Sequence, residues 1–184
     1  VYIDFYGLTP EAYNSLQIVN GNPAIVYYSG SGSLKYVRAN DASGTTWATP
    51  ITLDATGLVG LYSSLQIVNG NPAVSYYDYL GTKLKYIRAT NASGTAWSAP
   101  VTVDAIVGMG FYTSLQVVNG NPAISYSSGN SLALRYVRAT NVNGSAWAAP
   151  VSIDQTVFVG YKTSLQVVNG YPAISYYDVT NRNL

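Results

Sequence analysis

Short apolar runs recur along this chain, and turn-forming residues bound nearly all of them. The clearest case is a segment that occurs four times with little change, starting at Ser15, Ser64, Ser114 and Ser164. In the third copy it reads Ser-Leu-Gln-Val-Val-Asn-Gly-Asn-Pro-Ala-Ile-Ser-Tyr. Asn-Gly between two apolar runs is a strong hairpin signal, because both turn residues must adopt positive φ. Each copy is therefore expected to form two antiparallel strands joined by a tight turn.

Two further strands complete each repeat. A third strand is expected over 34–39, 84–89 and 134–139, and a fourth over 51–54, 101–104 and 151–154. A period of about 50 residues that carries only strand signals is typical of propeller blades. A β-sandwich is the alternative, but near-copies at fixed spacing favour radial repetition. The predicted fold class is all-β, a β-propeller of four-stranded antiparallel blades.

The whole chain, residues 1–184, is interpreted as a single propeller segment. Residues 1–4 match the last strand of a preceding blade, and blades are expected over 14–54, 63–104 and 113–154, with a partial blade over 163–184. Closed propellers usually have roughly four to eight blades. The segment is thus expected to be an incomplete propeller, or one whose ring is closed by association. That closure would come from self-association or from additional blades.

Composition narrows the chemistry. Only 9% of the 184 residues are charged and the net charge is +1, which argues against a nucleic-acid partner. Histidine and cysteine are both absent, so no metal or cofactor is expected. No apolar run reaches the ~20 residues of a membrane span. The 18 tyrosines suit an extracellular or cell-surface protein that faces carbohydrate, although tyrosine also simply forms strands well.

Large aromatic and charged residues recur once per repeat. The aromatic columns are Tyr36, Tyr86 and Tyr136, and Trp47, Trp97 and Trp147. The cationic columns are Lys35, Lys85 and Arg135, and Arg38, Arg88 and Arg138; the acidic column is Asp54, Asp104 and Asp154. We expect the aromatics to pack between neighbouring sheets and the cations to pair with the aspartates. The alternative for the cations is a ring that binds acidic glycans.

The turn before each tryptophan carries a family resemblance. Gly44-Thr45-Thr46-Trp47 and its two counterparts resemble the second half of the Asp-box hairpin of sialidases and related bacterial repeat proteins. The aspartate of that motif lies two residues before the glycine, where this chain has Ala42, Ala92 and Val142. Over almost its whole length the repeat also resembles those of large secreted bacterial propeller proteins. The resemblance implies a propeller fold, secretion and a structural role for the hairpin.

Two groups of loops vary between repeats. They cover 29–33, 78–83, 127–133 and 178–183 within blades, and 5–14, 55–63, 105–113 and 155–163 between blades. Both groups are expected on one face of the propeller, and loops on a rigid scaffold often carry function. The candidate ligand-binding residues on this face are Tyr62, Tyr112, Tyr161, Asp78 and Asp178; no catalytic residue is assigned. The apolar residues of the connections are expected to complete the core or to form a binding patch.

Three functions fit these features. The first is a non-catalytic binding or scaffolding propeller that presents its variable loops to a partner protein or a glycan. The second is a lectin in which tyrosines stack on sugar rings. The third is part of a sialidase-like glycosidase, for which the resemblance implies an arginine cluster, a tyrosine nucleophile with an assisting glutamate, and an aspartic acid/base. Because Glu11 is the only glutamate, the sequence favours the first function and predicts that the protein is not an enzyme.

Overall fold

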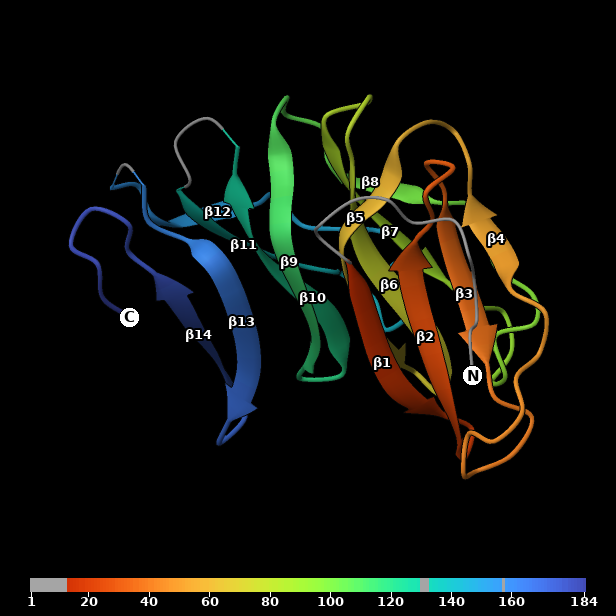
Figure 1. Cartoon of the computed structure of the whole chain (residues 1–184). Helices are drawn as coiled ribbons and strands as arrows, with labels where there is room; N and C mark the ends of the chain where they lie inside the picture. The colour runs from red at the N-terminus through yellow and green to blue at the C-terminus, as the bar shows by residue number, and fades with distance from the viewer. Residues whose placement is uncertain (1–12, 130–132, 157) are drawn as a thin grey trace.

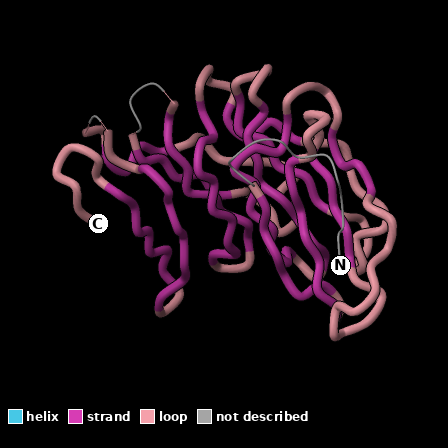
Figure 2. The backbone as a smooth tube through the Cα atoms, in the orientation of Figure 1, coloured by secondary structure: helices cyan, strands magenta, loops and turns pink. Residues whose placement is uncertain are grey.

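The computed structural model describes residues 13–129, 133–156 and 158–184. In these residues the chain forms antiparallel strands joined by turns and loops, without a helix (Figure 2). Three four-stranded sheets and one two-stranded sheet follow one another along the chain. The predicted all-β propeller of four-stranded blades is confirmed, whereas the strand expected at residues 1–4 lies outside the described residues.

Each full sheet contains four strands in chain order. The first sheet comprises β1 (Asn14–Val19), β2 (Asn22–Tyr28), β3 (Leu34–Arg38) and β4 (Ile51–Asp54). The second comprises β5 (Val59–Val68), β6 (Asn71–Asp78), β7 (Lys83–Arg88) and β8 (Val101–Asp104). The third comprises β9 (Met109–Val118), β10 (Asn121–Ser128), β11 (Leu134–Arg138) and β12 (Val151–Asp154), and the last contains β13 (Tyr161–Val168) and β14 (Tyr171–Tyr177).

The first strands of the four sheets lie next to one another. Strand β1 contacts β5, β5 contacts β9, and β9 contacts β13, while the other strands of each sheet lead away from this row (Figure 1). We call β1, β5, β9 and β13 the inner strands. This order is that of propeller blades around an axis, and it brings residues that are about 50 positions apart into direct contact.

The Asn-Gly turns form as the sequence predicts. In the first hairpin Asn20 and Gly21 have φ values of 46° and 83°, and the Asn-Gly pairs of the other repeats have similar values. Arg38 secures this turn, because its Nε donates to the carbonyl of Val19 at 2.8 Å and its second guanidinium nitrogen donates to that of Asn20 at 2.7 Å. The arginine column thus stabilises hairpins rather than pairing with aspartates.

Apolar side chains fill the space between neighbouring sheets. Leu65 of β5 is 2% exposed and packs with Val26 of β2, and Leu115 and Leu165 are equally buried at the next two interfaces. The predicted aromatic packing is confirmed: the rings of Tyr36 and Trp97 meet edge to face with centroids 5.2 Å apart. Aromatic pairs in this geometry contribute about 1 kcal/mol beyond the area they bury.

A charged cluster closes the interface between the first two sheets. The Tyr76 phenol donates to Asp54 Oδ2 at 2.7 Å, and Lys85 Nζ lies 3.3 Å from Asp54 and 2.8 Å from Asp78. Burial alone would raise the pKa of Asp54, but the hydrogen bonds from Tyr76 and Thr56 and the charge of Lys85 hold it below its usual value. The next interface repeats the arrangement with Arg135 3.3 Å from Asp104. The expected pairing of cations with aspartates therefore occurs, through the Lys85 column and between blades.

Candidate ligand-binding site

The site begins with an irregularity in the inner strands. Strand β5 pairs Leu61 with Tyr77 and then Ser64 with Ser75, so that Tyr62 and Ser63 form a β-bulge. Strands β9 and β13 are interrupted at the corresponding positions. These inner strands therefore begin earlier than predicted, inside the segments 55–63, 105–113 and 155–163 that the sequence assigned to connections. A bulge re-aims side chains at the edge of a sheet, and bulges are common near functional sites.

The bulges hold bulky residues in the left-handed region of backbone conformation. The φ values are 55° at Tyr62, 53° at Tyr112 and 51° at Lys162. Glycine usually takes this position, since a side chain there costs of order 1–3 kcal/mol. The same backbone strain recurs at three successive inner strands. Such recurrence is typical of a functional site, where a side chain keeps its position despite an unfavourable backbone conformation.

Threonines of the following strand hold two of these bulges. The hydroxyl of Thr113 donates to the carbonyl of Tyr62 at 2.8 Å and lies 2.8 Å from the hydroxyl of Ser75. Because Thr113 has a single proton and gives it to the carbonyl, the Ser75 hydroxyl is the donor of the second bond. Thr163 makes the same pair of bonds, to the carbonyl of Tyr112 and to Ser125. Each strained tyrosine is thus fixed by the next blade.

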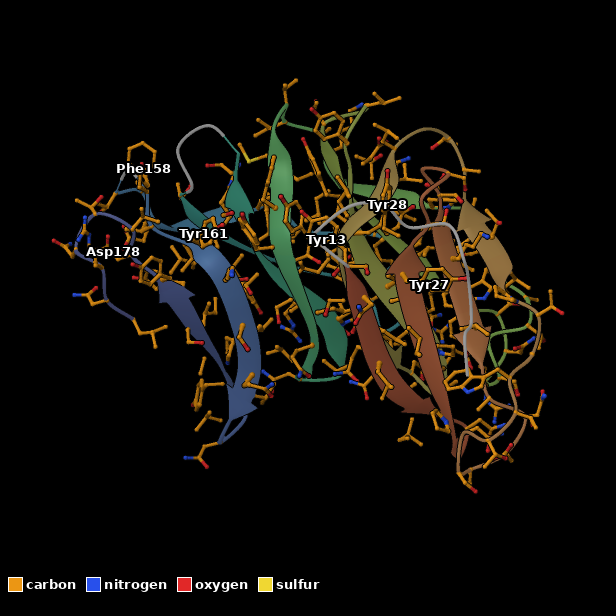
Figure 3. All side chains as sticks on the ribbon, in the orientation of Figure 1. Tyr13, Tyr27, Tyr28, Phe158, Tyr161 and Asp178 are labelled. Carbon is orange, nitrogen blue, oxygen red and sulfur yellow. The ribbon has the colours of Figure 1, made fainter. Side chains whose placement is uncertain are left out.

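Four tyrosine rings follow one another across the inner strands. The centroids of Tyr13 and Tyr62 are 4.5 Å apart, those of Tyr62 and Tyr112 are 4.5 Å apart, and those of Tyr112 and Tyr161 are 4.4 Å apart. We call these four side chains the tyrosine arc. Figure 3 shows its two ends, Tyr13 at the start of β1 and Tyr161 at the start of β13.

The tyrosine arc lines a hollow of about 400 Å³. Asn14, Ser63, Thr113, Lys162 and Thr163 line it as well, and all the tyrosines are half-buried. This size lies within the range of small-molecule sites, and its lining combines aromatic surface with hydroxyl and amide groups. The hollow can therefore hold a ligand that has both apolar faces and hydroxyl groups.

The Tyr112 phenol stays protonated at neutral pH. Burial, hydrogen bonding to Tyr161 and Tyr62 and the proximity of their phenols all raise the pKa of Tyr112 above its usual value. A neutral phenol both donates and accepts hydrogen bonds. The tyrosine arc therefore offers a ligand phenol groups for hydrogen bonding and aromatic ring surface for stacking.

A single cation lines the described part of the hollow. Lys162 occupies the backbone position that Tyr62 and Tyr112 hold in the preceding inner strands, and its Nζ lies 5.7 Å from the centroid of the Tyr161 ring. The Lys162 side chain is exposed. Within the described residues Lys162 forms no ion pair with a carboxylate, whereas Lys85 and Arg135 do. One end of the hollow is therefore positively charged.

The structure brings together three of the five candidate residues. Tyr62, Tyr112 and Tyr161 lie side by side in the tyrosine arc, whereas Asp78 and Asp178 lie elsewhere. Asp78 is the last residue of β6 rather than part of a loop, is 7% exposed, and pairs with Lys85. Asp178 accepts hydrogen bonds from the backbone of Thr180 and Asn181 in its own loop and does not line the hollow, although its neighbour Tyr177 pairs with Tyr161. The ligand-binding role of all five stays a prediction.

The apolar connections divide between core and surface. Val59 and Val159 are buried to 0% and 2% exposure, while Ile106 and Val107 at a loop tip are 54% and 68% exposed. The expectation that these segments complete the core holds for Val59 in β5 and for Val159 just before β13. The exposed residues at the loop tip fit the alternative expectation, an apolar binding patch.

Acidic residues are sparse at the hollow. Among the described residues, no carboxylate lines it and no group of three potential metal ligands is present. The described residues also include no helix long and apolar enough to cross a membrane. Glu11, which the glycosidase hypothesis requires, lies outside the described residues.

Several solved structures share this fold. They include the BP39L lectin from Burkholderia pseudomallei (TM-score 0.68, 16% identity, 91% of this chain and 52% of that chain) and an α-L-arabinofuranosidase from Clostridium thermocellum (0.59, 11%, 91% and 61%). The NanB sialidase from Streptococcus pneumoniae is a third (0.60, 19%, 91% and 28%). This chain spans about half the length of the lectin. No family model and no curated protein sequence matches the chain. At these identities the likeness defines the class of fold, a β-propeller shared by lectins and sialidases.

The expectation that the protein is not an enzyme was wrong as an inference from composition. Structures of this fold include the arabinofuranosidase, a polysaccharide lyase named as an ulvan lyase, and the sialidase. A small number of acids in one segment therefore gives no ground for excluding an activity. The resemblance to sialidases is supported at the level of the fold, whereas the Asp-box likeness of the hairpins stays a prediction.

Sequence reasoning missed six residues of the site, and three of them are informative. Tyr13, Ser63 and Lys162 all line the hollow. A signal was available for each, because they occupy the columns of Tyr62, Thr113 and Tyr112 once the repeats are aligned on their leucines. The bulges themselves had no signal, since a tyrosine gives no hint that it will adopt positive φ.

Proposed function

We propose that this chain binds carbohydrate in the hollow lined by the tyrosine arc and does so at the cell surface or outside the cell. The observation that carries the proposal is the arc itself: four half-buried phenols side by side, two of them on strained bulges, around a hollow of about 400 Å³. Sugar rings present apolar C–H faces and a rim of hydroxyls, and both find partners in such a lining. The lectin and the carbohydrate-acting enzymes of this fold support the assignment.

The backbone strain supports a binding role over simple packing. A buried aromatic cluster that only filled space would be satisfied by ordinary strand geometry, as Tyr36 and Trp97 show at the sheet interface. Tyr62 and Tyr112 instead adopt φ values of 55° and 53°, at a cost that the clamping threonines offset. The strained positions carry the two tyrosines into the lining of the hollow.

The test is a screen of immobilised neutral and acidic glycans, followed by titration of the saccharides that bind. Tyr112→Ala should weaken binding about tenfold, because one stacked ring contributes about 1 kcal/mol and its phenol adds hydrogen bonds. Tyr112→Phe should lose less, since it keeps the ring. Tyr171→Ala is the matched control, because Tyr171 is 75% exposed and lies outside the hollow.

Each result of the screen has a defined meaning. Binding that Tyr112→Ala and Tyr171→Ala reduce equally would refute the tyrosine arc as the site. A protein that binds no glycan would refute the proposal and leave a protein partner as the ligand of this face. Bound saccharides should also be followed for release of new reducing ends, because several structures of this fold are glycan-cleaving enzymes.

A further inference from the structure

The first step of the tyrosine arc, between β1 and β5, differs from the other two. At the second and third steps a threonine, Thr113 or Thr163, hydrogen-bonds to the carbonyl of the preceding tyrosine and to a serine hydroxyl. Those hydroxyls are fully used inside the protein. At the first step Ser63 replaces the threonine, and Val26 stands where β6 and β10 have Ser75 and Ser125.

Within the described residues, this pair of replacements leaves the Ser63 hydroxyl without a hydrogen-bond partner. Its hydroxyl oxygen is buried and makes no hydrogen bond within the described residues, and only 9% of the residue is exposed. Val26, fully buried in the adjoining core, cannot supply the bond that Ser75 supplies to Thr113. Buried hydroxyl groups are normally paired, so an orphan in a binding hollow calls for a partner from outside the protein.

The hollow lies next to the Ser63 side chain. Ser63 lines it together with Tyr13 and Tyr62, whose ring centroids are 4.5 Å apart. Because these rings are in contact and Ser63 Oγ is buried, a ligand hydroxyl reaches it when the rings part, and it can then both donate to and accept from Ser63 Oγ. At the other steps of the arc the corresponding threonine has no proton left to give.

We propose that Ser63 is the primary hydrogen-bonding subsite of the hollow and takes a hydroxyl group of a saccharide at the step between β1 and β5. This inference rests on the proposed carbohydrate-binding function and locates the ligand along the tyrosine arc. The chain's own repetition supports it, because the two neighbouring steps show how the same position looks when the hydroxyl is satisfied internally.

Two variants test the subsite from different sides. Ser63→Ala removes the hydroxyl, and Val26→Ser supplies the internal partner that the other repeats possess, without altering the surface of the hollow. The probes are chitohexaose, cellohexaose, xylohexaose and hexagalacturonate, titrated by calorimetry against the full chain. Both variants should weaken the tightest of these about three- to tenfold, the usual effect of one hydrogen bond. Ser98→Ala, an exposed serine outside the hollow, is the control.

The outcomes separate this inference from the proposed function. If Tyr112→Ala weakens binding but Ser63→Ala and Val26→Ser leave it unchanged, the subsite is refuted and the carbohydrate site stands. If the wild-type chain binds none of the four saccharides, and none in the glycan screen, both fail. Weakening by Val26→Ser alone supports the subsite even where Ser63→Ala folds poorly, because the added serine competes for the same hydroxyl.

Discussion

The Tyr76 phenol is the most informative single group at the blade interfaces, and Tyr76→Phe is the perturbation that tests its role. Tyr76 is fully buried and donates at 2.7 Å to Asp54, whose side chain is 1% exposed. Removing the donor leaves a buried carboxylate with one fewer hydrogen bond, and a bond to a charged group contributes about 1.5–3 kcal/mol. We expect Tyr76→Phe to lower the free energy of unfolding by about 2 kcal/mol.

The repeat supplies a matched control. Tyr176 donates to Asp154 at 3.0 Å in the same geometry, but both groups are more accessible to water. Water replaces the lost donor there, so Tyr176→Phe should cost less than about 0.5 kcal/mol. Urea unfolding is the assay: with a slope of about 2 kcal/mol per molar, the midpoint should fall by roughly 1 M for Tyr76→Phe and hardly at all for Tyr176→Phe. Equal shifts would refute the reasoning that burial sets the cost.

The same contact makes a prediction about pH. The native pKa of Asp54 is below its ordinary value of 3.8, so ionised Asp54 stabilises the fold above that value. The stabilisation is lost as the pH falls through the native pKa of Asp54. The difference between wild type and Tyr76→Phe should therefore be constant at neutral pH and shrink only below about pH 4. A difference that disappears near pH 6 would contradict the assignment to Asp54.

Three further predictions concern the turns and the hollow. Arg88→Ala removes two hydrogen bonds to carbonyls of the turn at Asn69 and should cost about 1 kcal/mol in urea unfolding, with Arg88→Lys recovering only part. Asp41→Ala should speed amide exchange at Thr45, whose N–H the Asp41 carboxylate accepts at 3.0 Å, whereas Asp41→Asn should not, because asparagine fills this position in the other repeats. Lys162→Gln should remove the salt dependence of binding to acidic saccharides and leave the binding of neutral ones nearly unchanged, because it removes the charge without adding a ring; unchanged salt dependence would exclude Lys162 as their contact.

The hairpins and the inter-blade packing were predictable because local signals determine them. Asn20-Gly21 adopts the backbone that its residue types require, and Tyr36 and Trp97 recur at a spacing that only packing between repeats explains. Asp78 was not predictable, since its role depends on Lys85 and on the neighbouring sheet. Pairing of this kind produces no signal in the local sequence pattern. A polar residue next to a glycine-containing segment is instead predicted to lie in a loop.

The turn before each tryptophan shows a similar limit at shorter range. The family pattern places an aspartate two residues before Gly44, where the chain has Ala42. In the structure the carboxylate that organises the turn is Asp41, one residue earlier, which accepts the backbone N–H groups of Thr45 and Thr46. An aspartate side chain can cap a turn from neighbouring positions, so a motif fixed in register misses it.

The differences between repeats locate function more sharply than the repeats themselves. Columns that pack or secure the fold keep their contacts from blade to blade, as the arginines at the turns and the leucines between sheets do. The columns change at Ser63 and Lys162 of the inner strands and at Val26 of β2. Together these changes alter what the hollow presents, with an unpaired hydroxyl at one end and a cation at the other. Stability alone favours the repeated residue at these positions, because that residue makes internal contacts in the neighbouring blades. A ligand in this hollow would therefore meet a buried hydroxyl at the step between β1 and β5 and a cation at β13, so the proposed site has two chemically different ends.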